Sequence, residues 1–182
     1  MQTSLPMPQK SSIILIGMPG SGKSTIGVLL AKSLSKDFID TDILIQTRCN
    51  MPLQEIIRAS GFLHLRHIEE DCILELQPCD AVIATGGSAV YSPRAMAHLK
   101  TSGIAVYLSA PLEVIRQRIT NFHSRGIASP HNQTLAEIYA ERTALYEQYA
   151  DCTVPSHAMR HEQVVAQIIN AISSNAGAPQ SI

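Results

Sequence analysis

Residues 17–24 read Gly17-Met18-Pro19-Gly20-Ser21-Gly22-Lys23-Ser24 and match the phosphate-binding (Walker A) pattern G-x-x-x-x-G-K-S/T in full. An apolar run at 12–16 comes directly before this stretch, and apolar residues at helical spacing follow it at 26–34. In a strand–loop–helix unit of this kind, backbone N–H groups and the positive end of the helix dipole both point at phosphate oxygens. The stretch and its context therefore predict a nucleoside triphosphate site.

The side chains of this loop suit the phosphates and the cation of a magnesium–nucleotide complex. The Lys23 ammonium can reach the β- and γ-phosphates, and the Ser24 hydroxyl can ligate Mg²⁺. The residues expected to bind the nucleotide are Gly20, Ser21, Gly22, Lys23, Ser24 and Thr25. Mg²⁺ is the expected cofactor, and the loop alone leaves the choice between ATP and GTP open.

Beyond the loop, short apolar runs alternate with helical patterns. The runs that read as strands are 12–16, 38–40, 81–85, 104–108 and 152–154. Helical spacing of apolar residues is clear at 26–34 and again at 164–172. This alternation predicts an α/β fold with a five-stranded parallel sheet and helices on both faces. Ligands of such sheets bind beyond the carboxyl ends of the strands, so the residues after each run are the ones to inspect for chemistry.

The composition narrows the class of protein further. The chain has 182 residues, 45% hydrophobic and 16% charged, with a net charge of −1, which argues against a broad basic surface for nucleic acid. The apolar run 13–16 is too short to span a membrane, and 1–10 shows no secretory signal, so a cytoplasmic protein is expected. The four cysteines form no C-x-x-C pair and are expected to be free thiols.

The domain organisation follows from where periodic patterns begin and end. We expect a flexible tail at 1–10, a single domain at 11–173 and a second flexible tail at 174–182, because both ends are short of periodic apolar residues. No linker or repeat interrupts the central region. A monomer is the expected state.

Polar and glycine residues follow two further strands. Asp40 and Asp42 end the second run, and in extended chain two such carboxylates point the same way. One could hold Mg²⁺ through water and the other could orient a substrate hydroxyl, although either could instead cap the following helix. Gly86 and Gly87 follow the third run, where they allow close approach of backbone to a ligand or simply form a tight turn.

Together these motifs resemble the shikimate kinase family in order and spacing. The stretches that carry the resemblance are 17–25, 40–42, Leu-Arg-His-Ile-Glu-Glu-Asp at 65–71 and Ala-Thr-Gly-Gly-Ser-Ala-Val at 84–90. Arg118, Arg125 and the segment 141–146 also fall where that family has its lid and its late arginines. The resemblance covers about 12–170. It implies a P-loop kinase fold with a mobile lid, placed here at 119–133.

The resemblance also implies an activity and a role for each matching residue. It implies transfer of the γ-phosphate of ATP to shikimate, giving shikimate 3-phosphate for aromatic amino-acid biosynthesis. Asp40 would lie near Mg²⁺, and Asp42 would bind the acceptor hydroxyl. The other implied contacts are Arg66 and Arg142 to the acceptor carboxylate, Gly86 and Gly87 to its ring hydroxyls, Arg125 to the transferring phosphoryl group and Arg118 beside the adenine. Planar guanidinium groups suit a carboxylate because each offers a bidentate fork.

Departures from the family pattern fall on the acceptor and lid side. Ser88 stands where the family usually has a third glycine, and Phe62 and Leu65 replace an acid and an aromatic before Arg66. In the lid, Gly126 replaces a proline. We therefore keep two alternatives: the same reaction on another hydroxy acid such as homoserine or gluconate, and a non-catalytic nucleotide-binding regulator.

Overall fold

The computed structural model describes residues 11–77, 80–119, 127–130 and 133–176 of the chain. The predicted tail at 1–10, the end of the second tail at 177–182 and much of the predicted lid, including Arg125, lie outside the described residues.

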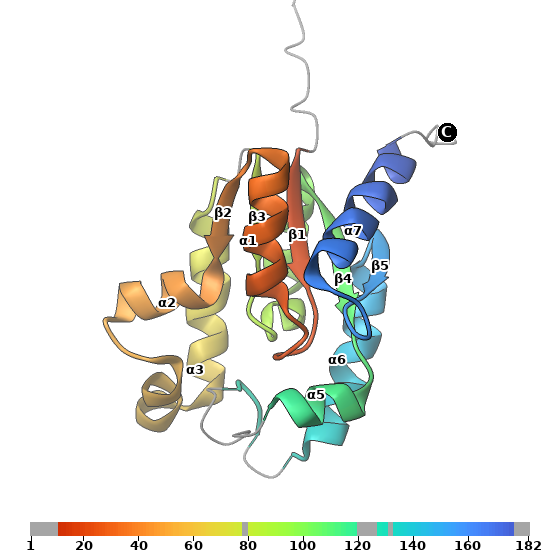
Figure 1. The fold of residues 1–182 in the computed structure, drawn as a ribbon. Helices are drawn as coiled ribbons and strands as arrows, with labels where there is room; N and C mark the ends of the chain where they lie inside the picture. Colours follow the sequence, from red (N-terminus) through yellow and green to blue (C-terminus); the bar gives the residue numbers. More distant parts are fainter. Residues whose placement is uncertain (1–10, 78–79, 120–126, 131–132, 177–182) are drawn as a thin grey trace, which may run out of the picture.

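Five parallel strands form one sheet in the order β2-β3-β1-β4-β5 (Figure 1). The strands are β1 (Ser12–Ile16), β2 (Asp37–Asp40), β3 (Ala81–Ala84), β4 (Gly103–Ser109) and β5 (Cys152–Pro155). Every run expected to be a strand is one, so the predicted α/β fold and its five-stranded parallel sheet are confirmed.

Helices connect the successive strands of this parallel sheet. They are α1 (Lys23–Leu34), α2 (Thr41–Cys49), α3 (Leu53–Glu75), α4 (Pro93–Ser102), α5 (Leu112–Arg118), α6 (Leu135–Tyr149) and α7 (His161–Ala176), with a 3-10 turn η1 (Ala89–Tyr91). Helix α3 is two helical segments joined at Gly61, whose φ of 82° lies in the left-handed region. Among the described residues, no helix is both long and apolar enough to cross a membrane.

The expected start of the C-terminal tail at residue 174 is wrong, because α7 continues to Ala176. The hydroxyls of Ser173 and Ser174 donate to the carbonyls of Ile169 and Asn170, at 2.8 Å and 2.9 Å. Small polar residues that read as a tail are thus accommodated on the exposed side of the helix.

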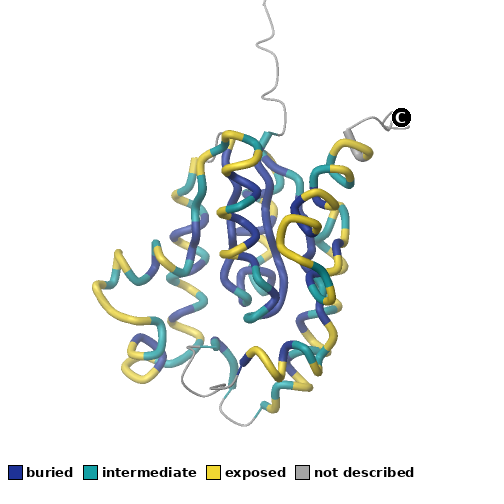
Figure 2. The backbone as a smooth tube through the Cα atoms, in the orientation of Figure 1, coloured by how far each residue is buried: buried dark blue, intermediate teal, exposed yellow. Residues whose placement is uncertain are grey.

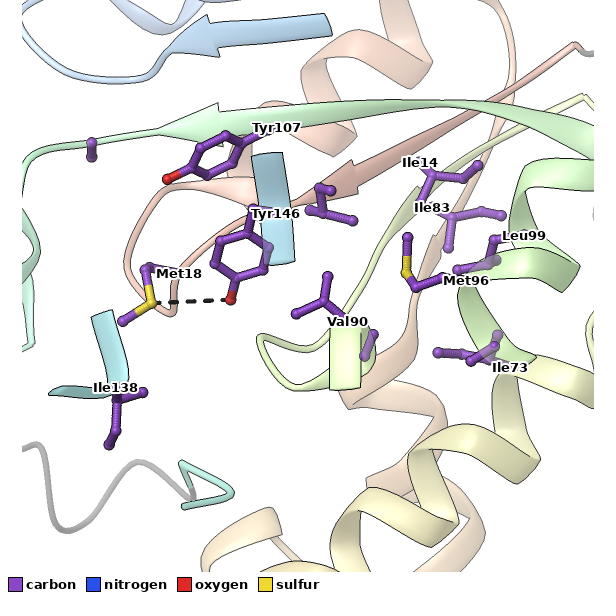
Figure 3. Packing of buried hydrophobic residues seen from close by; sticks show 14 of the residues in the cluster. Ile14, Met18, Ile73, Ile83, Val90, Met96, Leu99, Tyr107, Ile138 and Tyr146 are labelled. Carbon is purple, nitrogen blue, oxygen red and sulfur yellow. Dashed lines mark hydrogen bonds between the residues drawn. The ribbon is translucent and has the colours of Figure 1, made fainter. Parts of the chain in front are cut away.

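Both faces of the sheet are covered, as alternating side chains of β1 show. Ile13 and Leu15 point into the cluster with α1 and α7, whereas Ile14 and Ile16 point into the cluster with α3, α4 and α6. Buried residues accordingly concentrate in the strands and on the inward sides of the helices (Figure 2). In the second cluster Tyr146 stacks on Tyr107 with ring centroids 5.2 Å apart (Figure 3).

One contact determines how closely α1 lies against β2. A Cβ added to Gly27 of α1 would be 2.5 Å from Cε2 of Phe38 and 3.3 Å from Cδ1 of Leu15. Only glycine allows this approach, so the helix that follows the phosphate loop packs directly on the strand that ends in Asp40.

The carboxyl ends of all five strands lie at one edge of the sheet. The phosphate loop follows β1 there, α2 follows β2, and the glycine loop follows β3. In Figure 1, α2 and α3 stand on one side of this edge and α5 on the other. Segments far apart in the sequence therefore meet at a single place.

Candidate active site

The phosphate loop adopts backbone angles that only glycine tolerates well. Gly17, Gly20 and Gly22 have φ of 147°, 82° and 99°, and α1 begins immediately afterwards at Lys23. The Lys23 Nζ donates to the carbonyl oxygens of Gly17 at 2.8 Å and of Met18 at 3.0 Å. The ammonium is thus held across the loop, at the position where the sequence places phosphates.

The charge of Lys23 is poorly solvated. Burial lowers the pKa of Lys23 to about 8, against the opposing effects of the Asp42 and Asp40 carboxylates. An anion bound in the loop would favour the charged form. The electrostatics of this lysine therefore suit a ligand that brings negative charge.

Arg118 lies at the outer end of the phosphate loop. Its guanidinium donates to the carbonyl oxygen of Gly20 at 3.1 Å and to that of Ser156 at 3.2 Å. Arg118 and His161 line a cavity, here called the main cavity, whose lining also includes Ser24 and Thr25. Arg118 therefore lies against the nucleotide loop, and the cavity lining also includes a histidine that the sequence did not single out.

Asp40 and Asp42 do not form an extended pair. The strand ends at Asp40 and the helix begins at Thr41, so Asp40 is the N-cap and its Oδ1 accepts from the N–H groups of Asp42 at 3.0 Å and Ile43 at 3.3 Å. The capping alternative thus holds for Asp40. Asp42 instead lines the cavity, where burial raises its pKa and Lys23 opposes that shift.

The glycine loop after β3 is anchored from both sides. The Gly86 N–H donates to Oγ1 of Thr41 at 2.8 Å, and the Tyr146 hydroxyl donates to the Gly87 carbonyl at 2.7 Å. A Cβ on Gly86 would meet the carboxyl oxygens of Asp42 and Glu69, and a Cβ on Gly87 would be 2.9 Å from the Arg142 Nη1. The two glycines therefore provide space for charged side chains of other elements.

Arg66 and Arg142 come together although they are distant in sequence. Both donate to the same carbonyl oxygen, that of Ala128, at 3.0 Å and 2.9 Å. Arg142 is fully buried, and the Arg66 guanidinium lies 3.6 Å from the centre of the Tyr91 ring. Two guanidinium groups on one oxygen form a place that suits a carboxylate.

The main cavity has a volume of about 480 Å³ and extends from the phosphate loop to the region of Asp42 and Arg142. Its lining includes Lys23, Ser24 and Arg118 on the nucleotide side. On the other side it includes Asp42, Glu69, Gly87, Ser88, Ala128 and Arg142. Among the described residues, Gly86 and Arg66 are not part of this lining, and Arg66 instead lines a second cavity of about 180 Å³.

Glu69 is the principal site residue that the sequence did not single out. It is 3% exposed, and burial raises its pKa to about 7, with a further contribution from the Asp42 charge. On the sequence, Glu69 is one acid in a charged helical stretch, which usually means a solvated face. The signal was its spacing of three residues from Arg66, which places both on one side of α3.

The residues on this edge offer oxygen ligands suitable for Mg²⁺. Ser24 is exposed on the cavity, and the Asp40 and Asp42 carboxylates lie close enough to Lys23 to oppose the lowering of its pKa by burial. Magnesium sites of this type combine one or two protein oxygens with water and substrate phosphates. The donor set therefore fits the cation that the sequence predicts.

The parallel sheet, the phosphate loop after its first strand and the cavity that extends from it define a P-loop kinase of the nucleoside-monophosphate-kinase type. The shikimate kinase family model matches residues 19–173. This chain belongs to the shikimate kinase family.

Individual relatives agree with this assignment. The shikimate kinase of Haemophilus influenzae is 36% identical over 175 residues, which cover 94% of this chain and 97% of that protein. The solved structure of shikimate kinase from Acinetobacter baumannii in complex with shikimate has a TM-score of 0.85 at 30% identity, covering 92% of this chain and 96% of that one. A deoxyadenosine kinase from M. mycoides, at 13% identity and a TM-score of 0.60, is similar in fold alone.

Proposed function

We propose that this protein transfers the γ-phosphoryl group of ATP to the 3-hydroxyl of shikimate, giving ADP and shikimate 3-phosphate in aromatic amino-acid biosynthesis. The observation that carries the proposal is the single cavity, which has Lys23 and Ser24 at one end and Asp42 and Arg142 at the other. Such a cavity can bring a triphosphate and a carboxylate-bearing alcohol together in one space.

The nucleotide end supplies backbone and positive charge. The backbone amides of the phosphate loop would bind the phosphates, and the Lys23 ammonium would exchange its bonds to the Gly17 and Met18 carbonyls for phosphate oxygens. Ser24 and Asp40, the latter through water, would hold Mg²⁺, which neutralises phosphate charge when bound. Arg118 would lie beside the adenine.

The acceptor end positions the attacking hydroxyl. The carboxylate of shikimate would replace the Ala128 carbonyl as the partner of Arg142 and Arg66, and the ring hydroxyls would face Asp42 and the Gly86–Gly87 backbone. The hydroxyl oxygen forms the new bond to the γ-phosphorus as the bond to the β-phosphate oxygen breaks. Because the transition state is loose, Asp42 orients the hydroxyl and accepts its proton late.

The remaining parts of the proposal rest on the family resemblance. We assign Arg125, in the predicted lid at 119–133, to the transferring phosphoryl group, where its charge would stabilise the transition state. Closure of the lid would exclude water and so limit hydrolysis of ATP. We further propose that 11–173 act as one kinase domain of a cytoplasmic monomer.

The proposal is tested by measuring ADP release from purified protein with Mg-ATP and shikimate, homoserine or gluconate in parallel. We expect turnover with shikimate and formation of shikimate 3-phosphate. Turnover of homoserine or gluconate without turnover of shikimate would reassign the acceptor. Binding of ATP without turnover of any acceptor would indicate a nucleotide-binding regulator instead.

A further inference from the structure

Glu69 is a buried carboxyl group whose two oxygens have different surroundings. Its Oε2 accepts a hydrogen bond from the Ser88 hydroxyl, whereas Oε1 is buried and has no hydrogen-bond donor among the described residues. Both Glu69 and Ser88 line the main cavity at its acceptor end. A buried carboxyl oxygen without a donor is costly, which makes it a place where a ligand hydroxyl can bind.

The free oxygen of Glu69 lies beside Asp42. A Cβ added to Gly86 would meet both Oε1 of Glu69 and Oδ1 of Asp42, the latter at 2.6 Å, so the two oxygens converge over the glycine. The mutual influence of the two groups is also electrostatic, because the Asp42 charge raises the pKa of Glu69. Two carboxyl groups that converge in this way offer acceptor oxygens for two neighbouring hydroxyls of one ligand.

Ser88 determines which oxygen of Glu69 stays free. Its hydroxyl binds Oε2, so rotation of the carboxyl group away from Asp42 would break that hydrogen bond. Both residues also line the second cavity of about 180 Å³, so their hydrogen bond lies in the wall between the two cavities. A glycine at 88, as in the family pattern, has no side chain, so it could neither bind Oε2 of Glu69 nor contribute to the wall between the two cavities.

The backbone does not require glycine at this position. Ser88 has φ of −100° and ψ of −5°, and this negative φ lies outside the left-handed region that favours glycine. Replacing Ser88 by alanine therefore removes the hydroxyl at a position whose backbone does not favour glycine.

We propose that Ser88 is a positioning residue that sets acceptor specificity: it holds the Glu69 carboxyl group so that Glu69 and Asp42 together receive two neighbouring hydroxyls of the acceptor. The proposal rests on shikimate as the acceptor. It gives this chain its own means of recognising the hydroxyl next to the one that is phosphorylated.

The test compares shikimate with an analogue that lacks the hydroxyl next to the phosphorylated one, in wild type, Ser88→Ala and Ser88→Thr. For wild type we expect kcat/KM to be about tenfold or more lower with the analogue, a loss typical of a buried polar group left unpaired. Ser88→Ala should raise the KM for shikimate about tenfold, leave the KM for ATP unchanged and reduce discrimination to about twofold. Ser88→Thr retains the hydroxyl and should retain discrimination.

Ser92→Ala is a matched control. The Ser92 hydroxyl donates to Oε2 of Glu70, the next acid along α3, at 2.5 Å, but Ser92 lines only the second cavity. This variant should lower the melting temperature and leave both the KM for shikimate and the discrimination unchanged.

The possible outcomes separate this proposal from the proposed function. If wild type does not phosphorylate shikimate, the function itself is wrong and the role of Ser88 falls with it. If wild type is active and Ser88→Ala discriminates as wild type does, or loses activity equally with both acceptors, the positioning role is overturned while the function stands.

Discussion

The two ends of the cavity are built on different principles. The nucleotide end is mainly backbone from one contiguous stretch, in which three glycines with positive φ shape the loop and one lysine spans it. The acceptor end is made of side chains from α2, α3, the loop after β3 and α6. The first end can recognise any nucleoside triphosphate, whereas the second can change its ligand one side chain at a time.

The largest expected effect lies at the nucleotide end. Lys23→Ala should lower kcat by about 10³-fold or more with every acceptor, because it removes charge stabilisation from the transferring phosphoryl group. The measurement is coupled ADP release. Lys32→Ala, at an exposed lysine of the same helix, should be as active as wild type. Substantial activity of Lys23→Ala would refute the phosphate-loop assignment.

At the acceptor end, Arg142 should affect one substrate only. Arg142→Ala should raise the KM for shikimate about 100-fold and change the KM for ATP little, because a buried guanidinium is lost from the carboxylate position. Arg142→Lys keeps the charge in case the alanine variant does not fold, and should show a smaller increase in the same KM. Arg116→Ala, which breaks only an exposed pair with Glu113, is the control. Equal increases in both KM values would show that Arg142 does not bind the acceptor specifically.

The raised pKa of Glu69 should make the unfolding free energy of the protein depend on pH. The pKa of Glu69 is raised to about 7 in the folded protein, so the folded state holds this proton more tightly than the unfolded chain. This stabilisation is fully present below the ordinary glutamate pKa of about 4.5 and is lost as the pH rises through 7.

Glu69→Gln should remove that pH dependence. Relative to wild type, the variant should gain on the order of 2–3 kcal/mol in unfolding free energy between pH 5 and pH 8, measured by urea denaturation without ligands. A difference between the two proteins that does not vary with pH would mean that Glu69 titrates normally.

The smallest expected effect concerns the anchoring of the glycine loop. Tyr146→Phe removes the hydroxyl that donates to the Gly87 carbonyl and should destabilise the protein by about 1 kcal/mol and raise the KM for shikimate a few-fold. Tyr139→Phe removes a comparable bond, to the Ala110 carbonyl at 3.1 Å, and should lower stability without changing the KM. If both variants behave alike, the anchor has no bearing on acceptor binding.

The same contrast explains how far the sequence could predict the molecule. The strands and the helix that begins at Lys23 depend on local patterns, namely adjacent apolar residues and helical spacing after closely spaced glycines, and both were predicted correctly. Pairing of Glu69 with Ser88 depends instead on which face of α3 meets the loop after β3, and no local pattern encodes that contact. Arg66 alone resembled a solvated helix residue, and its position on Tyr91 emerged only with the tertiary structure.

The Asp40–Asp42 pair lies between these cases. The sequence left open whether each carboxylate faces a ligand or caps the following helix, and the start of α2 at Thr41 decides this for Asp40. Because the helix begins directly after Asp40, that carboxylate caps the helix, whereas Asp42, two residues later, lines the cavity.

The contact between Gly27 and Phe38 shows how activity could be lost without any change to a reacting residue. Gly27 lies one helical turn beyond Lys23, and Phe38 lies two residues before Asp40, so the separation of donor and acceptor depends on a position with no side chain. A methyl group there would leave every reacting residue in the sequence intact, but the Phe38 ring or α1 would have to shift to make room for it. Since phosphoryl transfer is sensitive to displacements of about 1 Å, activity could be lost through spacing alone.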